Sequence, residues 1–225
     1  DLMAFMDLVH DEADAMYDGF PGQTLVRAWE KLRFWWMGNS KRQAKKNISY
    51  HYDLGNDFYG LWLDETMTYS SALFKTGQEP LETAQTQKYA SMIDQMGAQP
   101  GDHILEIGCG WGGFAEYAAK ERGLKVTCLT ISKEQFKYAV DRIEKAGLSD
   151  KVTFKLQDYR DEKGVYDGIA SIEMFEAVGE KYWPAYFDTV RERLKPGKTA
   201  TLQIITVQDA RWEIYRKGVD FIQKY

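Results

Sequence analysis

Residues 103–113 read His-Ile-Leu-Glu-Ile-Gly-Cys-Gly-Trp-Gly-Gly, and this stretch decides the fold. Its first five residues are mainly apolar, which is typical of a short buried strand, and four of the next six are glycines. Gly108, Gly110 and Gly113 give the spacing G-x-G-x-x-G, which lets a backbone approach a nucleotide closely when it joins a strand to a helix. The spacing alone is weak evidence for a nucleotide site, so the assignment depends on the segments around it.

Segments of alternating type surround this loop. A helix with a 3.6-residue apolar period is expected from Leu81 to Met96, a second after the glycines as far as about Gly123, a third from the capping box Ser132–Gln135 to Gly147, and a fourth opened by Pro184. Short apolar runs predict strands over 103–107, 125–129, 152–156, 166–172 and 199–206. Strands and helices that alternate in this way form an α/β fold with a doubly wound, mostly parallel sheet, whose ligands sit beyond the carboxyl ends of the strands.

The composition limits the class of protein. The chain has 225 residues, a net charge of −5 and two cysteines, which are too few for a disulfide scaffold or a four-ligand zinc site, and we expect no metal. No apolar run approaches the length of a membrane span. We expect the C-terminal part of the sheet to be missing from this chain, because residues 212–225 read as one helix. We therefore expect a cytoplasmic protein that at most rests on the inner membrane surface.

Residues 27–46 form a basic and aromatic segment with seven Lys and Arg against one Glu. Tryptophans and Phe34 are interleaved with the charges, which suits an anionic membrane surface better than a nucleic acid, so no nucleic-acid partner is expected. An equally good reading is a helix whose aromatic side chains pack on the main domain. On this basis residues 1–46 are an N-terminal helical segment and residues 47–225 the main domain.

The end of the second predicted strand argues against a dinucleotide. A site for NAD typically has an acidic residue at this position to bind the ribose, but residues 128–132 read Cys-Leu-Thr-Ile-Ser. The additional Gly112, and Glu106 inside the strand before the loop, instead fit the variant that binds S-adenosylmethionine.

Five separated motifs resemble one family. Residues 51–72 with HYDLGNDFY, LWLD and MTYSSA, then 105–113, 129–135, 156–161 and 174–176, are similar in order and content to cyclopropane-fatty-acid synthases and mycolic acid cyclopropane synthases. The resemblance implies the class I S-adenosylmethionine-dependent methyltransferase fold. It also implies a reaction in which a one-carbon unit is added to the double bond of an unsaturated phospholipid acyl chain.

The resemblance also carries over the cofactor residues. It places S-adenosylmethionine against Tyr69 and Ser70 and over the glycine loop, with further residues at its methionine, ribose and adenine parts. These further residues are Glu106, Gly108, Gly110, Trp111, Gly112, Gly113, Thr130, Ser132, Gln135, Asp158, Tyr159 and Arg160.

The catalytic positions depart from the family pattern. The family removes a proton from a carbocation through a bound bicarbonate, and Glu176 matches the family's glutamate. Ser71 stands where the family usually has cysteine, and Gln203 where it usually has histidine. Serine and glutamine can still hydrogen-bond bicarbonate, so an altered anion site is expected. Its change would affect how the cation resolves, giving a methylated alkene or a methyl branch in place of a ring.

Two other functions stay open at this point. The same scaffold serves small-molecule N- or C-methyltransferases, and a cofactor-binding but inactive subunit would also fit the altered anion site. The state of assembly is open, with a homodimer as one candidate.

Overall fold

The computed structural model describes residues 2–11, 55–210 and 212. The chain divides into two compact units, residues 1–38 with 208–224 and residues 39–207, and each is treated by itself. In the first, α1 (Leu2–Asp11) confirms the helical periodicity at the N-terminus. The basic and aromatic segment 27–46 and most of the helix expected over 212–225 lie outside the described residues. The domain boundary at residue 46 stays a prediction.

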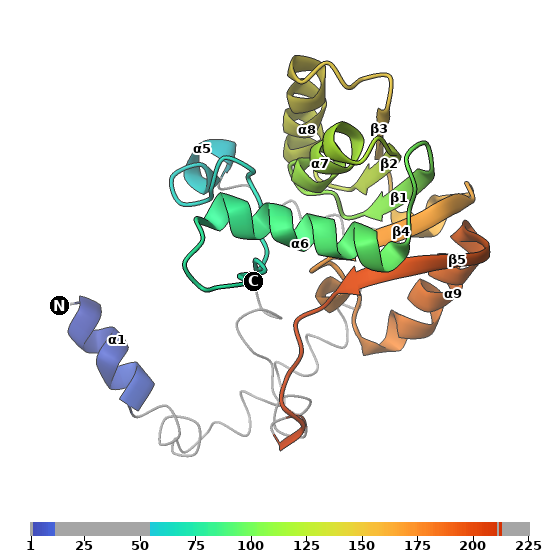
Figure 1. The fold of residues 1–225 in the computed structure, drawn as a ribbon. Helices are drawn as coiled ribbons and strands as arrows, with labels where there is room; N and C mark the ends of the chain where they lie inside the picture. The colour runs from blue at the N-terminus through green and yellow to red at the C-terminus, as the bar shows by residue number, and fades with distance from the viewer. Residues whose placement is uncertain (1, 12–54, 211, 213–225) are drawn as a thin grey trace. The chain divides into compact units, whose positions relative to one another are not determined.

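The second unit is built on a parallel sheet of five strands (Figure 1). The strands are β1 (His103–Ile107), β2 (Lys125–Thr130), β3 (Val152–Leu156), β4 (Tyr166–Ile172) and β5 (Leu194–Gln203). Their order is β3-β2-β1-β4-β5, and every neighbouring pair is parallel. The winding reverses between β1 and β4, which is where an open α/β sheet places its ligand.

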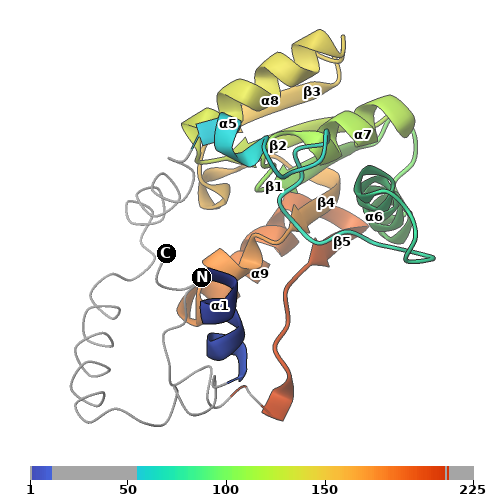
Figure 2. The same cartoon turned by 90° about the vertical axis from the view of Figure 1, so that its left-hand side faces the viewer.

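Helices cover both faces of this sheet, as the two views show (Figures 1 and 2). The elements outside the sheet are α5 (Gly55–Tyr59), α6 (Leu81–Met96), α7 (Gly113–Glu121), α8 (Lys133–Lys145), α9 (Trp183–Arg193) and the short turns η1 (Tyr159–Asp161), η2 (Phe175–Ala177) and η3 (Glu180–Tyr182). Helices α6, α7 and α8 pack on one face and α9 on the other. The predicted doubly wound α/β fold is therefore confirmed.

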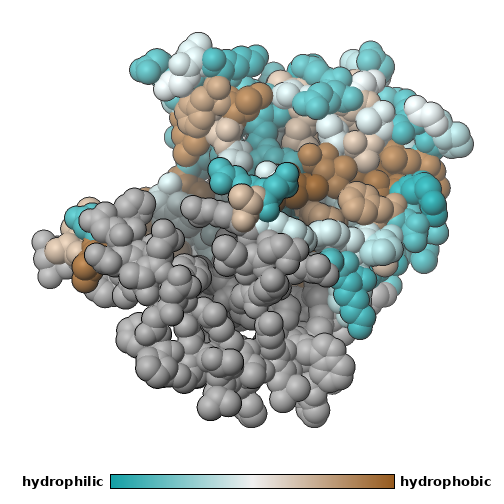
Figure 3. All heavy atoms as spheres, turned by 90° about the horizontal axis from the view of Figure 1, so that it is seen from below, coloured by the Kyte–Doolittle hydropathy of each residue, from teal (hydrophilic) through white to brown (hydrophobic). Residues whose placement is uncertain are grey.

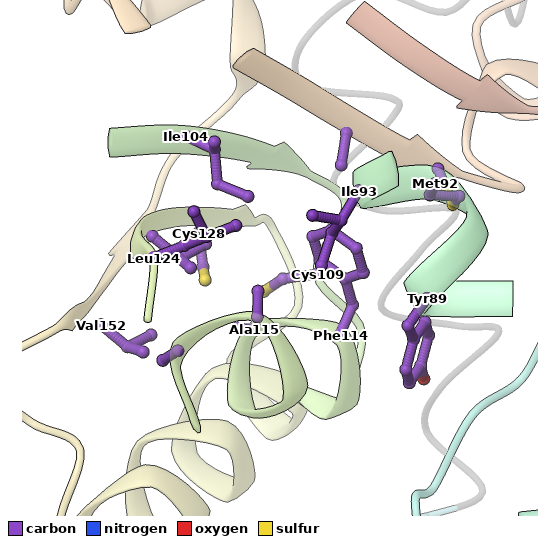
Figure 4. Packing of buried hydrophobic residues seen from close by; sticks show 14 of the residues in the cluster. Tyr89, Met92, Ile93, Ile104, Cys109, Phe114, Ala115, Leu124, Cys128 and Val152 are labelled. Carbon is purple, nitrogen blue, oxygen red and sulfur yellow. The ribbon is translucent and has the colours of Figure 1, made fainter. Parts of the chain in front are cut away.

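Two apolar clusters fill the space between sheet and helices. The larger joins side chains of α6 and α7, among them Ile93 and Phe114, to Ile104 and Cys128 of the sheet (Figure 4). The smaller packs Tyr186 and its neighbours on α9 against the other face. Ile104 enters the larger cluster, whereas Leu105 and Ile107 enter the smaller, so β1 is buried on both faces, which explains why it reads as an apolar run.

The fifth strand differs from its predicted bounds of 199–206. It begins at Leu194, because Tyr166 pairs with Leu194 before a register shift that brings Gly168 opposite Thr199. It ends at Gln203, because the next backbone N–H groups have no neighbouring strand to meet. Residues 204–206, Ile-Ile-Thr, therefore continue the strand pattern without pairing.

The predicted capping box of α8 forms only in part. The Ser132 hydroxyl accepts a hydrogen bond from the Gln135 backbone N–H at 3.3 Å, as expected for an N-cap. The Gln135 side chain does not return the bond, because it meets the Thr130 hydroxyl, and that hydroxyl accepts the Ser132 N–H. Gln135, which the capping box predicts to bond back to the helix N-terminus, thus links α8 to the end of β2.

Large apolar side chains also remain on the surface of the described residues. Leu61 is 82% exposed, and Phe58 and Trp62 beside it are about half exposed. Figure 3 shows hydrophobic patches interrupted by hydrophilic ones on one face. No helix among residues 2–11 and 55–210 has the length and apolar character that crossing a membrane requires.

Candidate active site

A pocket opens beyond the carboxyl ends of β1, β2 and β4, at the point where the strand order reverses. Its lining comes from Tyr89 and from residues within segments 67–70, 106–114, 129–135, 157–160 and 172–178. Most predicted cofactor residues line it: Tyr69, Ser70, Glu106, Gly108, Gly110, Trp111, Gly113, Thr130, Gln135, Asp158, Tyr159 and Arg160. Gly112 and Ser132 lie behind the lining, at the N-caps of α7 and α8. The parts of the cofactor that these residues would contact stay predictions.

The glycines are required by close approaches as well as by backbone angles. Gly108 has a φ of +81°, and a Cβ there would stand 2.8 Å from the Met174 side chain. A Cβ on Gly113 would stand 2.8 Å from the carbonyl oxygen of Thr66, because the segment before α6 crosses the first turn of α7. The loop is thus bounded by neighbouring chain on two sides, and its glycines offer only backbone to the pocket.

One side of the pocket is aromatic. Tyr69 lies 5.6 Å from Tyr59 and 5.4 Å from Trp62 between ring centroids, and Tyr59 lies 5.0 Å from Trp111. The Trp111 indole donates a hydrogen bond to Asn56 at 2.7 Å, which fixes its ring. Aromatic faces carry negative charge density, so this side of the pocket favours a cationic ligand group.

Glu106 is a buried acid at the base of the pocket. It is 2% exposed, and the hydrogen bond to its side chain comes from the Cys128 thiol, 3.6 Å away. Burial raises the pKa of Glu106 to about 8, while the Cys128 contact lowers it slightly. A carboxyl in this environment ionises readily only when a cation arrives, which makes it a suitable partner for a positively charged ligand.

The residues beyond β3 form a charged pair. Arg160 donates two hydrogen bonds to Asp158, at 2.7 and 2.6 Å, and the Asp158 carboxylate also caps η1. Tyr159 packs edge-on against Tyr186, with ring centroids 5.4 Å apart, and burial raises its pKa. The bidentate pair holds this turn rigidly at the rim of the pocket.

Two of the three predicted catalytic residues meet at an acid that the sequence did not single out. Ser71 donates to Glu173 Oε1 from its backbone N–H at 2.9 Å and from its hydroxyl at 2.6 Å. The Gln203 amide donates to the same oxygen at 2.8 Å. Glu173 also lines the pocket, directly after β4. Its place at the end of a central strand beside the switch point is the sequence signal that identifies it.

Glu173 is held in an unusual backbone conformation. Its φ is +45°, in the left-handed region that costs a residue other than glycine about 1–2 kcal/mol. Its own N–H donates to the Gln203 carbonyl at 2.9 Å, beyond the last paired residues of β4 and β5. Strain of this kind persists where the surroundings determine the geometry. Here Gln203 holds Glu173 twice, because its carbonyl accepts the Glu173 N–H and its side-chain amide donates to the Glu173 carboxylate.

Lys88 supports the same cluster from α6. It is 3% exposed, and its ammonium donates to the Ser70 hydroxyl at 2.7 Å and to the Ser71 carbonyl at 3.0 Å. Burial lowers the pKa of Lys88 to about 8, and the carboxylates of Glu173 and Asp64 oppose that change. A buried cation thus fixes the loop that carries Ser71.

The third predicted catalytic residue, Glu176, contacts the segment that follows Gln203. Glu176, in η2, accepts the backbone N–H of Ile205 through Oε1, and its buried Oε2 has no hydrogen-bond partner among the described residues. No hydrogen bond among these residues joins it directly to Ser71 or Gln203, and its catalytic role stays a prediction. The described part of the chain also has no group of His, Cys, Asp and Glu that would hold a metal ion.

A five-stranded parallel sheet in this order, with a glycine loop after β1 and a pocket over the switch point, is the fold of class I S-adenosylmethionine-dependent methyltransferases. Residues 39–225 match the family described as "Mycolic acid cyclopropane synthetase", and the chain belongs to this family.

Individual relatives agree with this assignment. The chain is 41% identical over 197 residues to the tuberculostearic acid methyltransferase UfaA1 of Mycobacterium tuberculosis, covering 84% of this chain and 46% of the relative. It is 42% identical over 175 residues to the cyclopropane-fatty-acyl-phospholipid synthase of Escherichia coli K12, covering 78% of this chain and 42% of the relative. The chain therefore spans less than half the length of these two relatives.

Solved structures give the same result. Mycolic acid cyclopropane synthase CmaA1, complexed with SAH and CTAB, superimposes with a TM-score of 0.67 at 31% identity, over 70% of this chain and 55% of that one. The cyclopropane synthase MmaA2 from Mycobacterium tuberculosis gives 0.68 at 28% identity, over 77% and 68%. Coclaurine N-methyltransferase, at 21% identity, shares the fold.

Proposed function

We propose that the protein binds S-adenosylmethionine and adds its one-carbon unit to the double bond of an unsaturated phospholipid acyl chain. The observation that carries the proposal is the pocket at the switch point, which joins a bare glycine backbone, an aromatic wall and the buried Glu106. The names of the relatives, which include fatty acid methyltransferases and cyclopropane synthases, support the lipid substrate.

The residues present fit this cofactor. Tyr69 and Trp111 would face a sulfonium or ammonium group, and Glu106 would balance its charge. Thr130 and Gln135, both nearly buried at the end of β2, offer a hydroxyl and an amide for a ribose in place of the missing carboxylate. When bound, the cofactor supplies an electrophilic methyl group. The chain contributes orientation and exclusion of water, because an alkene is a weak nucleophile that must be aligned with the methyl.

The product separates two versions of the proposal. In the first the cation loses a proton from the transferred methyl and closes a ring. In the second no ring forms. The cation either loses a proton from the acyl chain to give an internal methylated alkene, or a hydride shift moves it to the methylated carbon and a proton leaves the methyl group to give a terminal methylene. A saturated methyl branch would then need a separate reductant. The second version is favoured by the names of relatives that are fatty acid methyltransferases and by the altered positions Ser71 and Gln203.

The membrane is proposed as the place of reaction. An acyl chain of a phospholipid is reached from a bilayer surface, and the basic and aromatic segment 27–46 has the composition for peripheral docking on anionic lipid. Vesicles with and without anionic lipid test this part by co-sedimentation. Equal binding to neutral and anionic vesicles would contradict it.

The decisive assay uses the full-length protein, vesicles of dioleoyl phospholipid and S-adenosylmethionine with a CD3 methyl group. Ring closure and formation of a terminal methylene both retain two deuterium atoms, and an internal methylated alkene retains three. Mild hydrogenation then reduces the alkenes and leaves most of the ring intact. Vesicles of saturated lipid are the control. Recovery of unmodified oleoyl chains alone, by mass spectrometry, would refute the proposal.

A further inference from the structure

The donors that would hold a bicarbonate are already engaged by the protein. Three hydrogen bonds, from the Ser71 N–H, the Ser71 hydroxyl and the Gln203 amide, converge on Glu173 Oε1. The Gln203 amide also donates to the Ser71 hydroxyl at 2.9 Å, which closes the cluster. All the hydrogen bonds that the described residues make to the Glu173 carboxylate go to Oε1, which leaves Oε2 without a donor from them, and Glu173 itself lines the pocket.

A bicarbonate does not fit this arrangement. It would have to displace Glu173 from its three donors or lie against a second negative charge in the same place, and like charges at this distance repel strongly. The family resemblance implied a bound anion between Ser71 and Gln203. The structure instead has a carboxylate of the chain itself at that position.

We propose that Glu173 is the base of the reaction and replaces the diffusible anion with a tethered carboxylate. The inference rests on the proposed function. The electron pair of the acyl double bond forms a bond to the methyl carbon, and the methyl–sulfur bond breaks with its electron pair staying on sulfur. Glu173 Oε2 then takes a proton from the resulting carbocation. The electron pair of that C–H bond forms the third side of the ring or a new double bond, so no oxidant or reductant is needed.

The surroundings hold Glu173 in place for this role. Its positive φ turns the side chain away from the strand direction and toward Ser71, which lies 102 residues earlier in the chain. Lys88 fixes the partner loop through the Ser71 carbonyl and the Ser70 hydroxyl. A base held by donors on both sides needs little reorganisation when the cation forms.

Substitution of Glu173 tests the proposal in the full-length protein. Glu173→Gln keeps the size of the side chain and removes the base, and we expect kcat to fall about 100- to 10,000-fold, the usual contribution of a general base. The affinity for S-adenosylmethionine, measured by calorimetry, should change less than about twofold. Glu144→Gln, an exposed acid on α8, is the matched control and should behave as the wild type.

Bicarbonate itself provides the second arm. Wild-type turnover in CO2-free buffer should not rise when bicarbonate is added. Glu173→Gly relieves the positive φ, so it is expected to fold, and it leaves the three donors pointing at an open site. Added bicarbonate should restore part of its activity. Wild-type activity that depends on bicarbonate, or a Glu173→Gln variant with more than a tenth of wild-type kcat, would overturn the proposal.

A binding measurement keeps the inference separate from the proposed function. Line broadening of 13C-labelled bicarbonate should appear with Glu173→Gly and be absent with the wild type and Glu144→Gln, whether or not a lipid product forms. Equal broadening with wild type and Glu173→Gly would refute the built-in carboxylate. If no lipid is modified but the two proteins differ as expected, the proposed substrate is wrong and the occupation of the anion site by Glu173 stands.

Discussion

Replacing Glu106 with glutamine should make the cofactor-free protein more stable at neutral pH. Glu106 is 2% exposed, and burial raises its pKa from 4.5 to about 8. At pH 7 the unfolded chain holds this group ionised and the folded chain holds it protonated. The difference between pH 7 and 4.5, at about 1.4 kcal/mol for each pH unit, amounts to about 3 kcal/mol against folding. Glutamine does not ionise and avoids this penalty.

The difference in unfolding free energy between Glu106→Gln and the wild type should depend on pH. Because the folded-state pKa of Glu106 lies above its unfolded value, the folded state binds more protons, and wild-type stability is lost as pH rises from about 4.5 to about 8. The advantage of Glu106→Gln should therefore be near zero at pH 4.5 and grow to about 3 kcal/mol at pH 7. Urea unfolding of both proteins across this range measures the difference.

Other titrating groups affect both proteins equally, so the difference between their unfolding free energies isolates Glu106. Glu144→Gln, with an exposed side chain on α8, should leave the unfolding free energy unchanged at every pH. A Glu106→Gln protein that is less stable than wild type at pH 7, or a difference that does not change with pH, would show that Glu106 is ionised in the folded protein and that the reasoning is wrong.

Three further outcomes follow from the same geometry. Binding of S-adenosylmethionine to the wild type near pH 7 should release up to one proton, because a bound cation lowers the pKa of Glu106; calorimetry in two buffers of different ionisation enthalpy measures this release, and Glu106→Gln should show none. Gly113→Ala should lower the free energy of unfolding by about 1–3 kcal/mol and weaken cofactor binding, because its Cβ would meet the Thr66 carbonyl at 2.8 Å. Gly147→Ala, in open space at a φ of +68°, is the control for backbone strain alone and should leave cofactor binding intact. Turnover should fall above about pH 8, where buried Lys88 loses its charge, and Lys88→Met should have a lower kcat without this fall; a wild-type profile that is flat from pH 7 to 9 would contradict the role of Lys88.

Most of the fold follows from local patterns. The strands at 103–107, 152–156 and 166–172 have the predicted bounds, because each is a short run that contains apolar or β-branched residues and lies between turn-forming segments. The fifth strand was placed wrongly at both ends. Lys195–Lys198 contains proline and glycine and reads as a turn, yet it lies within β5, while 204–206 reads as a strand and is unpaired. Pairing depends on the neighbouring strand, which local sequence does not contain.

The residues of the candidate site were also predicted only in part. The glycine loop and the residues after β2 are contiguous with strand ends, so the sequence places them at the pocket, where the structure has them. Glu173 was missed as a site residue, although it also follows a strand. Its position in the site depends on a hydrogen bond to Ser71, 102 residues away in the chain, and on a positive φ that a glutamate in the sequence does not predict.

The departures at positions 71 and 203 are better understood as one change than as two losses. Taken singly, serine and glutamine in these places weaken an anion site. Their donors lie on segments that meet only because the loop before α6 crosses the ends of β4 and β5, and at this meeting point Glu173 supplies the negative charge. A tethered carboxylate is present at every turnover, whereas a diffusible anion must bind each time. It follows that a chain with Ser71 and Gln203 but no acid at position 173 would again need an anion from solution.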